Sequence, residues 1–181
     1  MAISHDLKID HKVVRRLEAA LRVMADMVRK GNGPTGADLE EAMMLMTDFV
    51  DIYHHGKEET CLFPLVEGAH EDQKKTVHGF LVEHEFGRRA ARMIRQKYER
   101  WAKGDLEAAE ALARFILTYA DFIKTHTEKE DVWFDVLDGR LLKSGEQREI
   151  LECISRAERG EVEERRAEFA SRVDALASKY K

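Results

Sequence analysis

Apolar side chains recur at helical spacing over four long stretches of this chain, and few residues interrupt them. In the first stretch Leu7, Val14 and Leu21 fall seven residues apart, so they share one face of a helix. The 181 residues include only 2 Pro and 11 Gly, and 36% are charged, mostly the helix-forming Glu, Lys and Arg. An all-α fold is therefore predicted. Its four long helices cover about residues 6–30, 38–63, 71–103 and 106–137.

Short sequences separate these predicted helices. The string GNGPTG follows the first helix, Pro64 and Gly68 mark the end of the second, and Gly104 closes the third. Long helices with short connections are typical of an up-down-up-down four-helix bundle. We predict such a bundle over residues 1–140.

A helical extension is predicted after the bundle, over residues 141–181. It contains two shorter amphipathic stretches, about 146–158 and 161–179, which Gly160 separates. Their apolar faces need a surface to cover. The extension is therefore expected to pack on the outside of the bundle, with Phe169, Val173 and Leu176 facing inward.

Charge and composition argue against several classes of protein. The net charge is −5, and basic residues are interleaved with acidic ones, which argues against nucleic acid as a partner. No apolar run approaches the roughly 18 residues of a membrane span, and the first residues do not resemble a secretory signal. Cys61 and Cys153 are too few and too far apart to suggest a disulfide framework. Cys61 falls one turn beyond Glu58, so the alternatives are a side chain that approaches the site and, preferred here, a small buried hydrophobic residue. A soluble cytoplasmic protein is expected.

Each long helix places one histidine on or near its apolar stripe. These residues are His11, His54, His84 and His126. A buried polar group without a partner costs about 2 kcal/mol or more. One such histidine is more often a hydrogen-bonded core residue than a ligand, and that alternative applies to each one taken alone. Four that converge inside one bundle favour shared metal ions.

Two glutamates strengthen the case for metal. Glu58 follows His54 by four residues, and Glu130 follows His126 by four. Four residues are about one helical turn, so each pair can hold one metal ion from one helix face. In the fourth helix Asp131 competes with Glu130, but it would lie about 140° round the helix from the histidine. Glu130 is therefore preferred.

The second helix offers a competing register. His55 and Glu59 have the same spacing as His54 and Glu58. The apolar stripe runs through His54 and Glu58, so this pair is predicted to face the interior. His55 and Glu59 are then expected at the edge, either next to the ligands or in solvent.

The donor atoms narrow the choice of metal. Imidazoles and carboxylates without a thiolate suit iron, manganese or zinc. The chain has no His-Glu-x-x-His string, which argues against a zinc protease. A Glu-x-x-His string occurs at Glu67 to His70, beyond Pro64 in a predicted loop, so the paired motifs of ferritin-like bundles are missing.

Taken in order, these strings resemble the hemerythrin-like, HHE cation-binding family. They are DH at 10–11, HHGKEE at 54–59 with LFP at 62–64, EHEFGR at 83–88, and His126 with KED at 129–131. The resemblance covers about residues 5–140. It implies a non-haem centre of two iron ions, oxo- or hydroxo-bridged, with Glu58 and Glu130 as bridging carboxylates. The terminal nitrogen ligands it implies are His11, His54, His84 and His126.

One position departs from the oxygen-carrying members of that family, which have two histidines one turn apart in the third helix. Here the residue one turn before His84 is Phe80. His78 lies about 120° round the helix from His84 and would need a bend to ligate. His5 and Tyr119 are further alternatives as ligands. A missing nitrogen would leave an open position, which favours reaction over reversible storage.

The leading hypothesis is a di-iron protein that senses or reacts with dioxygen, peroxide or nitric oxide. The alternatives are a peroxide-disproportionating oxidoreductase, an iron-storage or delivery protein, and a mainly structural bundle. A small-molecule ligand is the expected partner, and a monomer and a homodimer are both compatible with the sequence.

Overall fold

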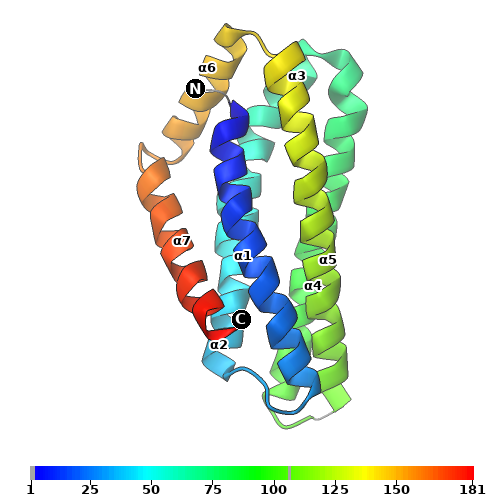
Figure 1. Cartoon of the computed structure of the whole chain (residues 1–181). Coiled ribbons are helices and arrows are strands. Elements are labelled where there is room, and N and C mark those ends of the chain that lie inside the picture. Colours follow the sequence, from blue (N-terminus) through cyan, green and yellow to red (C-terminus); the bar gives the residue numbers. More distant parts are fainter. Residues whose placement is uncertain (1–2, 106) are drawn as a thin grey trace.

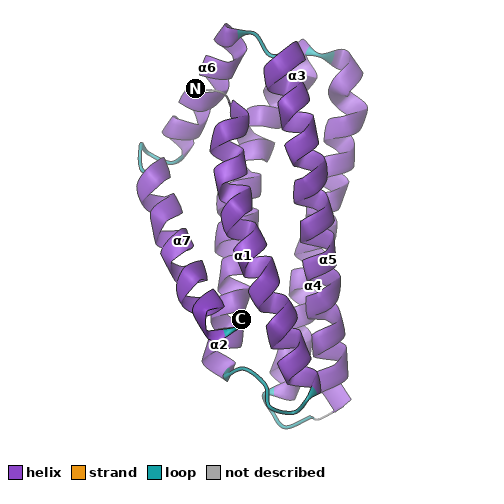
Figure 2. Ribbon diagram, viewed as in Figure 1, coloured by secondary structure: helices purple, strands orange, loops and turns teal. Residues whose placement is uncertain are grey.

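The computed structural model describes residues 3–105 and 107–181. Within these ranges the chain consists of helices joined by short loops, and no strand is present (Figure 2). The all-α prediction is confirmed. The α-helices are α1 (Ile3–Arg29), α2 (Gly36–Met44), α3 (Phe63–Ala69), α4 (Lys74–Trp101), α5 (Glu107–Val136), α6 (Ser144–Ala157) and α7 (Val162–Lys179).

Several shorter helical turns complete these elements. Two π-helical stretches, η1 (Leu45–His55) and η2 (Glu58–Leu62), connect α2 to α3 so that residues 36–69 form one continuous helix. A 3-10 turn, η3 (Glu71–Gln73), precedes α4, and a π-helical turn, η4 (Leu137–Leu141), follows α5. The predicted ends of the long helices agree with these bounds except in the second helix.

The second helix does not end at Pro64. It continues to Ala69, and Pro64 stands in the first turn of α3 directly after the π-helical turn η2. A proline removes one backbone hydrogen bond from a helix, and here it does so next to a wide turn, in which the N–H of Phe63 already bonds five residues back to the carbonyl of Glu58. The prediction that Pro64 helps to mark the end of this helix is therefore wrong.

The long helices form a bundle with the extension along one side (Figure 1). Helix α5 packs against both α1 and α4, and α7 packs against α1. The N-terminal end lies beside α6, whereas the C-terminal end lies beside α2 (Figure 1). The predicted inward residues of α7 are all buried, with Phe169, Val173 and Leu176 at 6%, 0% and 2% exposure.

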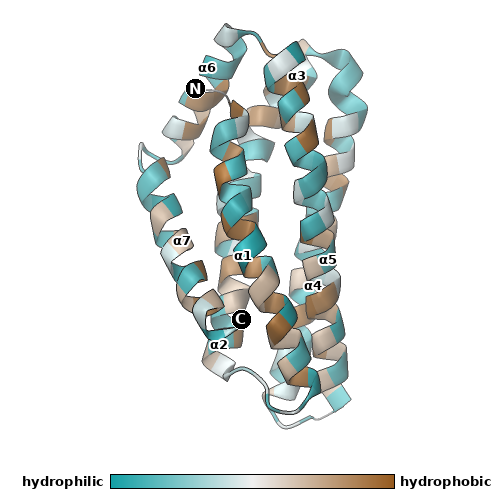
Figure 3. Ribbon diagram, viewed as in Figure 1, coloured by the Kyte–Doolittle hydropathy of each residue, from teal (hydrophilic) through white to brown (hydrophobic). Residues whose placement is uncertain are grey.

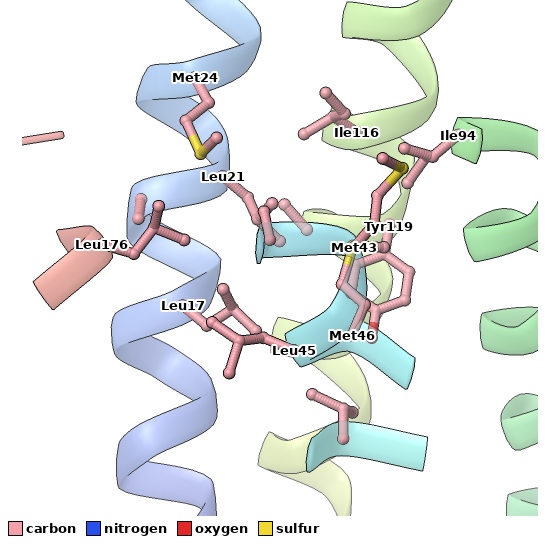
Figure 4. Packing of buried hydrophobic residues seen from close by; sticks show 14 of the residues in the cluster. Leu17, Leu21, Met24, Met43, Leu45, Met46, Ile94, Ile116, Tyr119 and Leu176 are labelled. Carbon is pink, nitrogen blue, oxygen red and sulfur yellow. The ribbon is translucent and has the colours of Figure 1, made fainter. Parts of the chain in front are cut away.

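The hydrophobic core has two parts, one towards each end of the bundle. Along each helix hydrophobic residues alternate with hydrophilic ones (Figure 3). The larger part contains Leu17, Leu21 and Met24 of α1, and Leu176 of α7 packs beside them (Figure 4). The smaller part gathers aromatic side chains around the other end, among them Phe63, Phe80, Trp133 and Phe134, with Ile150 and Ile154 of α6. The layer of the bundle between these two apolar parts can therefore contain polar side chains.

A disulfide joins Cys61 of η2 to Cys153 of α6, with Cα atoms 5.7 Å apart. The expectation that the two cysteines are not linked is wrong. They are 92 residues apart in sequence, and only the packing of α6 against η2 brings them together. The bond fastens the extension to the bundle at the turn that follows Glu58.

Across the described parts of the chain, no helix combines the length and the apolar character needed to cross a lipid bilayer.

Candidate metal centre

A band of polar side chains crosses the bundle between the two parts of the core. All six predicted ligands lie in this band, and each is fully buried at 0% exposure. They come from α1, the π-helical turns, α4 and α5, so that every long helix of the bundle contributes. The six residues are His11, His54, Glu58, His84, His126 and Glu130.

His55 is a seventh member of this band. Its side chain is buried at 2% exposure, so the expectation that it lies at the edge is wrong. An ordinary α-helix turns about 100° per residue, which would separate the neighbours His54 and His55 widely. Here η1 ends in a wider π turn, in which the N–H of Gly56 donates to the carbonyl of Asp51, five residues back. The wider turn lets both imidazoles reach the interior.

Four of the side chains form what we call the His11 group: His11, His54, Glu58 and Glu130. One ligand atom from each lies within 4.8 Å of the others. The Nε2 atoms of His11 and His54 are 3.0 Å apart. Nε2 of His11 is 3.3 Å from Oε2 of Glu130, and Nε2 of His54 is 3.6 Å from Oε1 of Glu58. This spacing can hold one ion.

Three histidines form the His55 group: His55, His84 and His126. Their ligand atoms also lie within 4.8 Å of one another. The imidazoles of His55 and His84 stack with ring centroids 3.8 Å apart.

Both glutamates face the two groups at once. Glu58 directs Oε1 towards His54 and Oε2 towards Nε2 of His84, at 3.4 Å. Glu130 directs Oε2 towards His11 and also towards Nε2 of His126, at 3.2 Å, while its Oε1 lies 3.5 Å from His84. Each carboxylate of the His11 group thus also faces histidines of the His55 group.

Each of the five histidines has a carboxylate near its other ring nitrogen. At His11, His84 and His126 the carboxylate lies within hydrogen-bond distance of Nδ1 and holds the proton there, so the lone pair of Nε2 points into the band and is free to bind a metal. The Nδ1–oxygen distances are 2.7 Å for His11–Asp131, 2.7 Å for His84–Glu59, 2.9 Å for His126–Glu83, 3.5 Å for His54–Asp10 and 3.7 Å for His55–Asp51. The last two are electrostatic contacts rather than good hydrogen bonds.

The structure assigns different places to the two acidic residues that competed in the sequence. Asp131 lies outside the ligand band and accepts from His11, and Glu59 does the same for His84. The other carboxylates of this outer layer, Asp10, Asp51 and Glu83, were not identified from the sequence.

A sequence signal for most of this outer layer exists. Asp10, Glu59, Glu83 and Asp131 are each the immediate neighbour of a predicted ligand on the same helix. A neighbour lies about 100° round the helix. It therefore contacts a ligand carried by an adjacent helix.

Burial shifts the pKa values of both the histidines and the glutamates. It lowers the pKa of His54 to about 3 and the pKa of His126 to about 4, so these imidazoles are neutral near pH 7. Burial also raises the pKa of Glu58 and that of Glu130 well above the usual range. A carboxylate in such a place becomes ionised when a cation is bound beside it.

The hydrogen-bond pattern fits a bound metal. Both carboxylate oxygens of Glu58 and of Glu130, and Nε2 of His84 and of His126, have no hydrogen-bond partner among the described residues. Leaving such groups unpaired in the interior costs about 1–3 kcal/mol each. The facing Nε2 atoms of His11 and His54 cannot satisfy each other if both carry their protons on Nδ1. Metal ions would satisfy all of these atoms together.

The other candidate ligands differ in position. His5 and His78 are exposed and lie outside the band. Phe80 is buried at 6% and packs against Phe63 and Trp133. Tyr119 is buried and lies beside Met43 and Met46 (Figure 4).

Two pockets lead to the His55 group. The first, of about 180 Å³, lies between η1 and α4 and is lined by His55, Tyr119, Asp51 and three arginines of α4, namely Arg88, Arg92 and Arg95. The second is an open groove of about 500 Å³ between α4 and α5, where Val82, Phe86 and Phe122 lie outside His126. None of the residues that line either pocket belongs to the His11 group.

Gly87 has a structural role between these pockets. A Cβ atom at this position would lie 2.7 Å from Cε1 of Phe122, which is too close. The missing side chain therefore lets Phe122 approach α4 and stack on His126, with ring centroids 5.3 Å apart.

Comparison with known protein families gives one match. Residues 2–137 match the model of the hemerythrin HHE cation-binding domain. No curated protein and no solved structure is significantly similar to the chain. The matched range contains every residue of the His11 group and the His55 group, and it ends before α6.

Proposed function

The chain belongs to the hemerythrin HHE cation-binding family, and from this premise we propose that its bundle holds two iron ions. The His11 group would hold one ion and the His55 group the other. The observation that carries this proposal is the set of buried, unpartnered ligand atoms, in which both Glu58 and Glu130 face both groups. Two carboxylates placed in this way suit a pair of bridged cations.

The donor set supports iron. Imidazole and carboxylate ligands suit iron, manganese and zinc, whereas thiolate is absent because both cysteines are in the disulfide. Zinc in structural sites usually has four ligands in a closed tetrahedral set. Seven side chains around two ions, with carboxylates shared between them, are better suited to a redox-active pair.

We infer that the bound molecule is small and reaches the ion of the His55 group. The pocket between η1 and α4 is lined in part by His55 and, at about 180 Å³, has room for a small molecule. Iron bound there would supply binding and redox chemistry towards dioxygen, nitric oxide or peroxide. The protein's own contribution is the enclosed position, the fixed imidazoles and the pocket. We propose sensing of, or reaction with, such a molecule as the function.

Peroxide disproportionation is the second candidate. Tyr119 lines the same pocket as His55, so a phenol is near a molecule bound there. A phenol can donate a proton, which peroxide cleavage requires. No comparable observation favours iron storage or a purely structural bundle.

The deciding experiment measures metal content and reactivity. The chain is purified, its iron per chain is determined, and visible spectra are recorded before and after addition of dioxygen, nitric oxide or peroxide. We expect two irons per chain, a spectrum that changes with at least one of these molecules, loss of about one iron in His54→Ala, and a lower content of both irons in Glu130→Ala, because Glu130 faces both groups. His78→Ala is the control, because this histidine is exposed. Substoichiometric iron that none of these substitutions affects would refute the proposal, whereas rapid oxygen release from peroxide would favour the second candidate.

A further inference from the structure

A network of four charged side chains connects α7 to His54. Arg166 of α7 donates from Nε to Oδ1 of Asp10 and from Nη2 to Oδ1 of Asp6, both at 2.6 Å. Lys57 donates to the other oxygen of Asp10, Oδ2. Oδ2 of Asp10 is in turn 3.5 Å from Nδ1 of His54. One carboxylate therefore lies between a proposed metal ligand and a residue of the C-terminal extension.

The network is closed and balanced in charge. Two carboxylates, Asp6 and Asp10, face two cations, Lys57 and Arg166. Asp10 is buried at 0% exposure and Lys57 at 1%, while the side chain of Arg166 is 11% exposed. Both oxygens of Asp10 are occupied by a cation, so its carboxylate cannot rotate without losing an ion pair. Buried ion pairs of this kind hold a geometry because breaking one leaves an uncompensated charge.

The cations that pair with the carboxylates of the other histidines come from a different part of the chain. Arg15 binds Asp131, Arg88 binds Asp51 and Glu59, and Lys129 binds Glu83. These three cations belong to the matched family domain, and their side chains are 28–53% exposed. Among the described residues, only the network behind His54 includes a cation from beyond residue 137.

We propose that Arg166 is a positioning residue of the metal centre, and that through Asp10 it holds the imidazole of His54 in the orientation that binds metal. The extension is then part of the centre although it lies outside the family domain. This inference rests on the proposed function, since it concerns the ion of the His11 group. Outer partners of a ligating histidine fix its ring and raise its basicity.

The competing explanation is that Arg166 only docks α7 on the bundle. The structure offers a way to separate this docking role from the positioning role. Helix α7 is also held by buried Phe169, Val173 and Leu176. A second ion pair on the same helix, Arg172 with Glu41, has distances of 2.8 and 3.2 Å and touches none of the proposed ligands or their carboxylates. Replacement of Arg172 therefore removes one docking ion pair and leaves Asp10 intact.

The test compares Arg166→Gln, Arg166→Lys and Arg172→Gln in the full chain. Iron per chain, the dissociation constant for ferrous iron by chelator competition, and Mössbauer spectra of the iron-57 protein are measured, together with thermal unfolding of the metal-free forms. We expect Arg166→Gln to weaken one of the two iron sites about tenfold and to alter one of two Mössbauer signals. Arg172→Gln should leave both unchanged, and Arg166→Lys, which keeps the charge, should restore most of the affinity.

The outcomes separate this inference from the proposed function. If the wild-type chain binds no iron, the proposed function fails and this inference fails with it. If the wild type binds two irons and Arg166→Gln has the affinity and spectrum of Arg172→Gln, only the positioning role is overturned. Should Arg166→Gln fail to fold, the double variant Arg166→Gln with Asp6→Asn replaces it, because it removes one cation and one carboxylate and so leaves the network balanced in charge. An unchanged iron affinity and Mössbauer spectrum in this double variant would then count against the positioning role.

Discussion

The His11 group and the His55 group both contain histidines that face Glu58 and Glu130, but the two groups have very different surroundings. The His11 group is closed in, with Phe134 stacked against His11 at 5.6 Å and the buried pair of Asp10 and Lys57 behind His54. The His55 group lies against two pockets, and its outer carboxylates pair with the partly exposed cations Arg88 and Lys129.

This difference indicates two roles for the two proposed ions. Surroundings decide whether a metal can exchange a ligand, because water and small molecules must reach it. An ion in the His11 group would hold the helices together, and an ion in the His55 group would meet the incoming molecule. Two proposed sites that share their carboxylates would thus serve a structural role and a reactive role.

The largest effect is expected from a substitution at a glutamate that faces both groups. Glu58→Gln keeps the shape of the side chain but removes its negative charge, and Glu58 faces both groups. We expect the affinity for both ions to fall by more than about 100-fold, measured as metal per chain after dialysis against a chelator. Glu128→Gln, at an exposed position of α5, is the control. Full retention of one ion in Glu58→Gln would contradict a bridging role.

A somewhat smaller effect is expected when a ligand of only one group is removed, and such variants distinguish the two groups. His54→Ala removes a ligand of the His11 group only, and His126→Ala removes a ligand that belongs to the His55 group. Each variant should keep about one of two ions, but only His126→Ala should lose its reaction with nitric oxide, followed by visible absorption. If the reaction is lost equally in both variants, the assignment of one structural and one reactive ion is wrong.

The charge that lines the pocket between η1 and α4 should have a moderate effect on the rate at which an anion binds. Arg95 lines the pocket beside His55, whereas Arg89 is exposed on the same helix and does not line it. In Arg95→Glu the association rate of azide, an anionic probe, should fall about tenfold at low salt, and the rate for neutral nitric oxide should change little. Arg89→Glu, which has the same change of charge, should leave both rates nearly unchanged. Equal slowing in the two variants would indicate a general effect of net charge.

The smallest effect concerns protons released when metal binds. Burial raises the pKa of Glu58 and of Glu130, so these carboxyls must lose protons to bind a cation. His54 and His126, with pKa values lowered to about 3 and 4, have no proton to release near pH 7. Metal affinity should therefore rise with pH, and calorimetry in two buffers of different ionisation enthalpy should detect net proton release. Affinity that falls as the pH rises would contradict these assignments.

Much of the architecture could be predicted from local patterns. The stripe of Leu7, Val14 and Leu21 was sufficient to predict α1, and the burial of Phe169 followed from the amphipathic pattern of α7. These features depend on neighbours within one or two helical turns. The same local spacing indicated His54 with Glu58 and His126 with Glu130 as pairs that share a helix face.

The features that were missed depend on contacts between distant segments or on irregular turns. Cys61 and Cys153 meet only because α6 folds back on η2, and nothing near either residue reports this. His55 was placed at the edge because a regular helix was assumed, and Arg166 reaches Asp10 across 156 residues of sequence. A helical periodicity carries no information about such contacts.

The π-helical turns in η1 and η2 have a consequence for how this chain tolerates changes in length. Each π turn accommodates one residue more than an α-helical turn, with little effect on the helix on either side. Deleting one residue from each of η1 and η2 would allow the segment to return to a regular helix with its ends still in place. His54, His55 and Glu58 would then no longer face the interior together. In this bundle the extra residues of two π-helical stretches separate a set of buried polar side chains from an ordinary helical core.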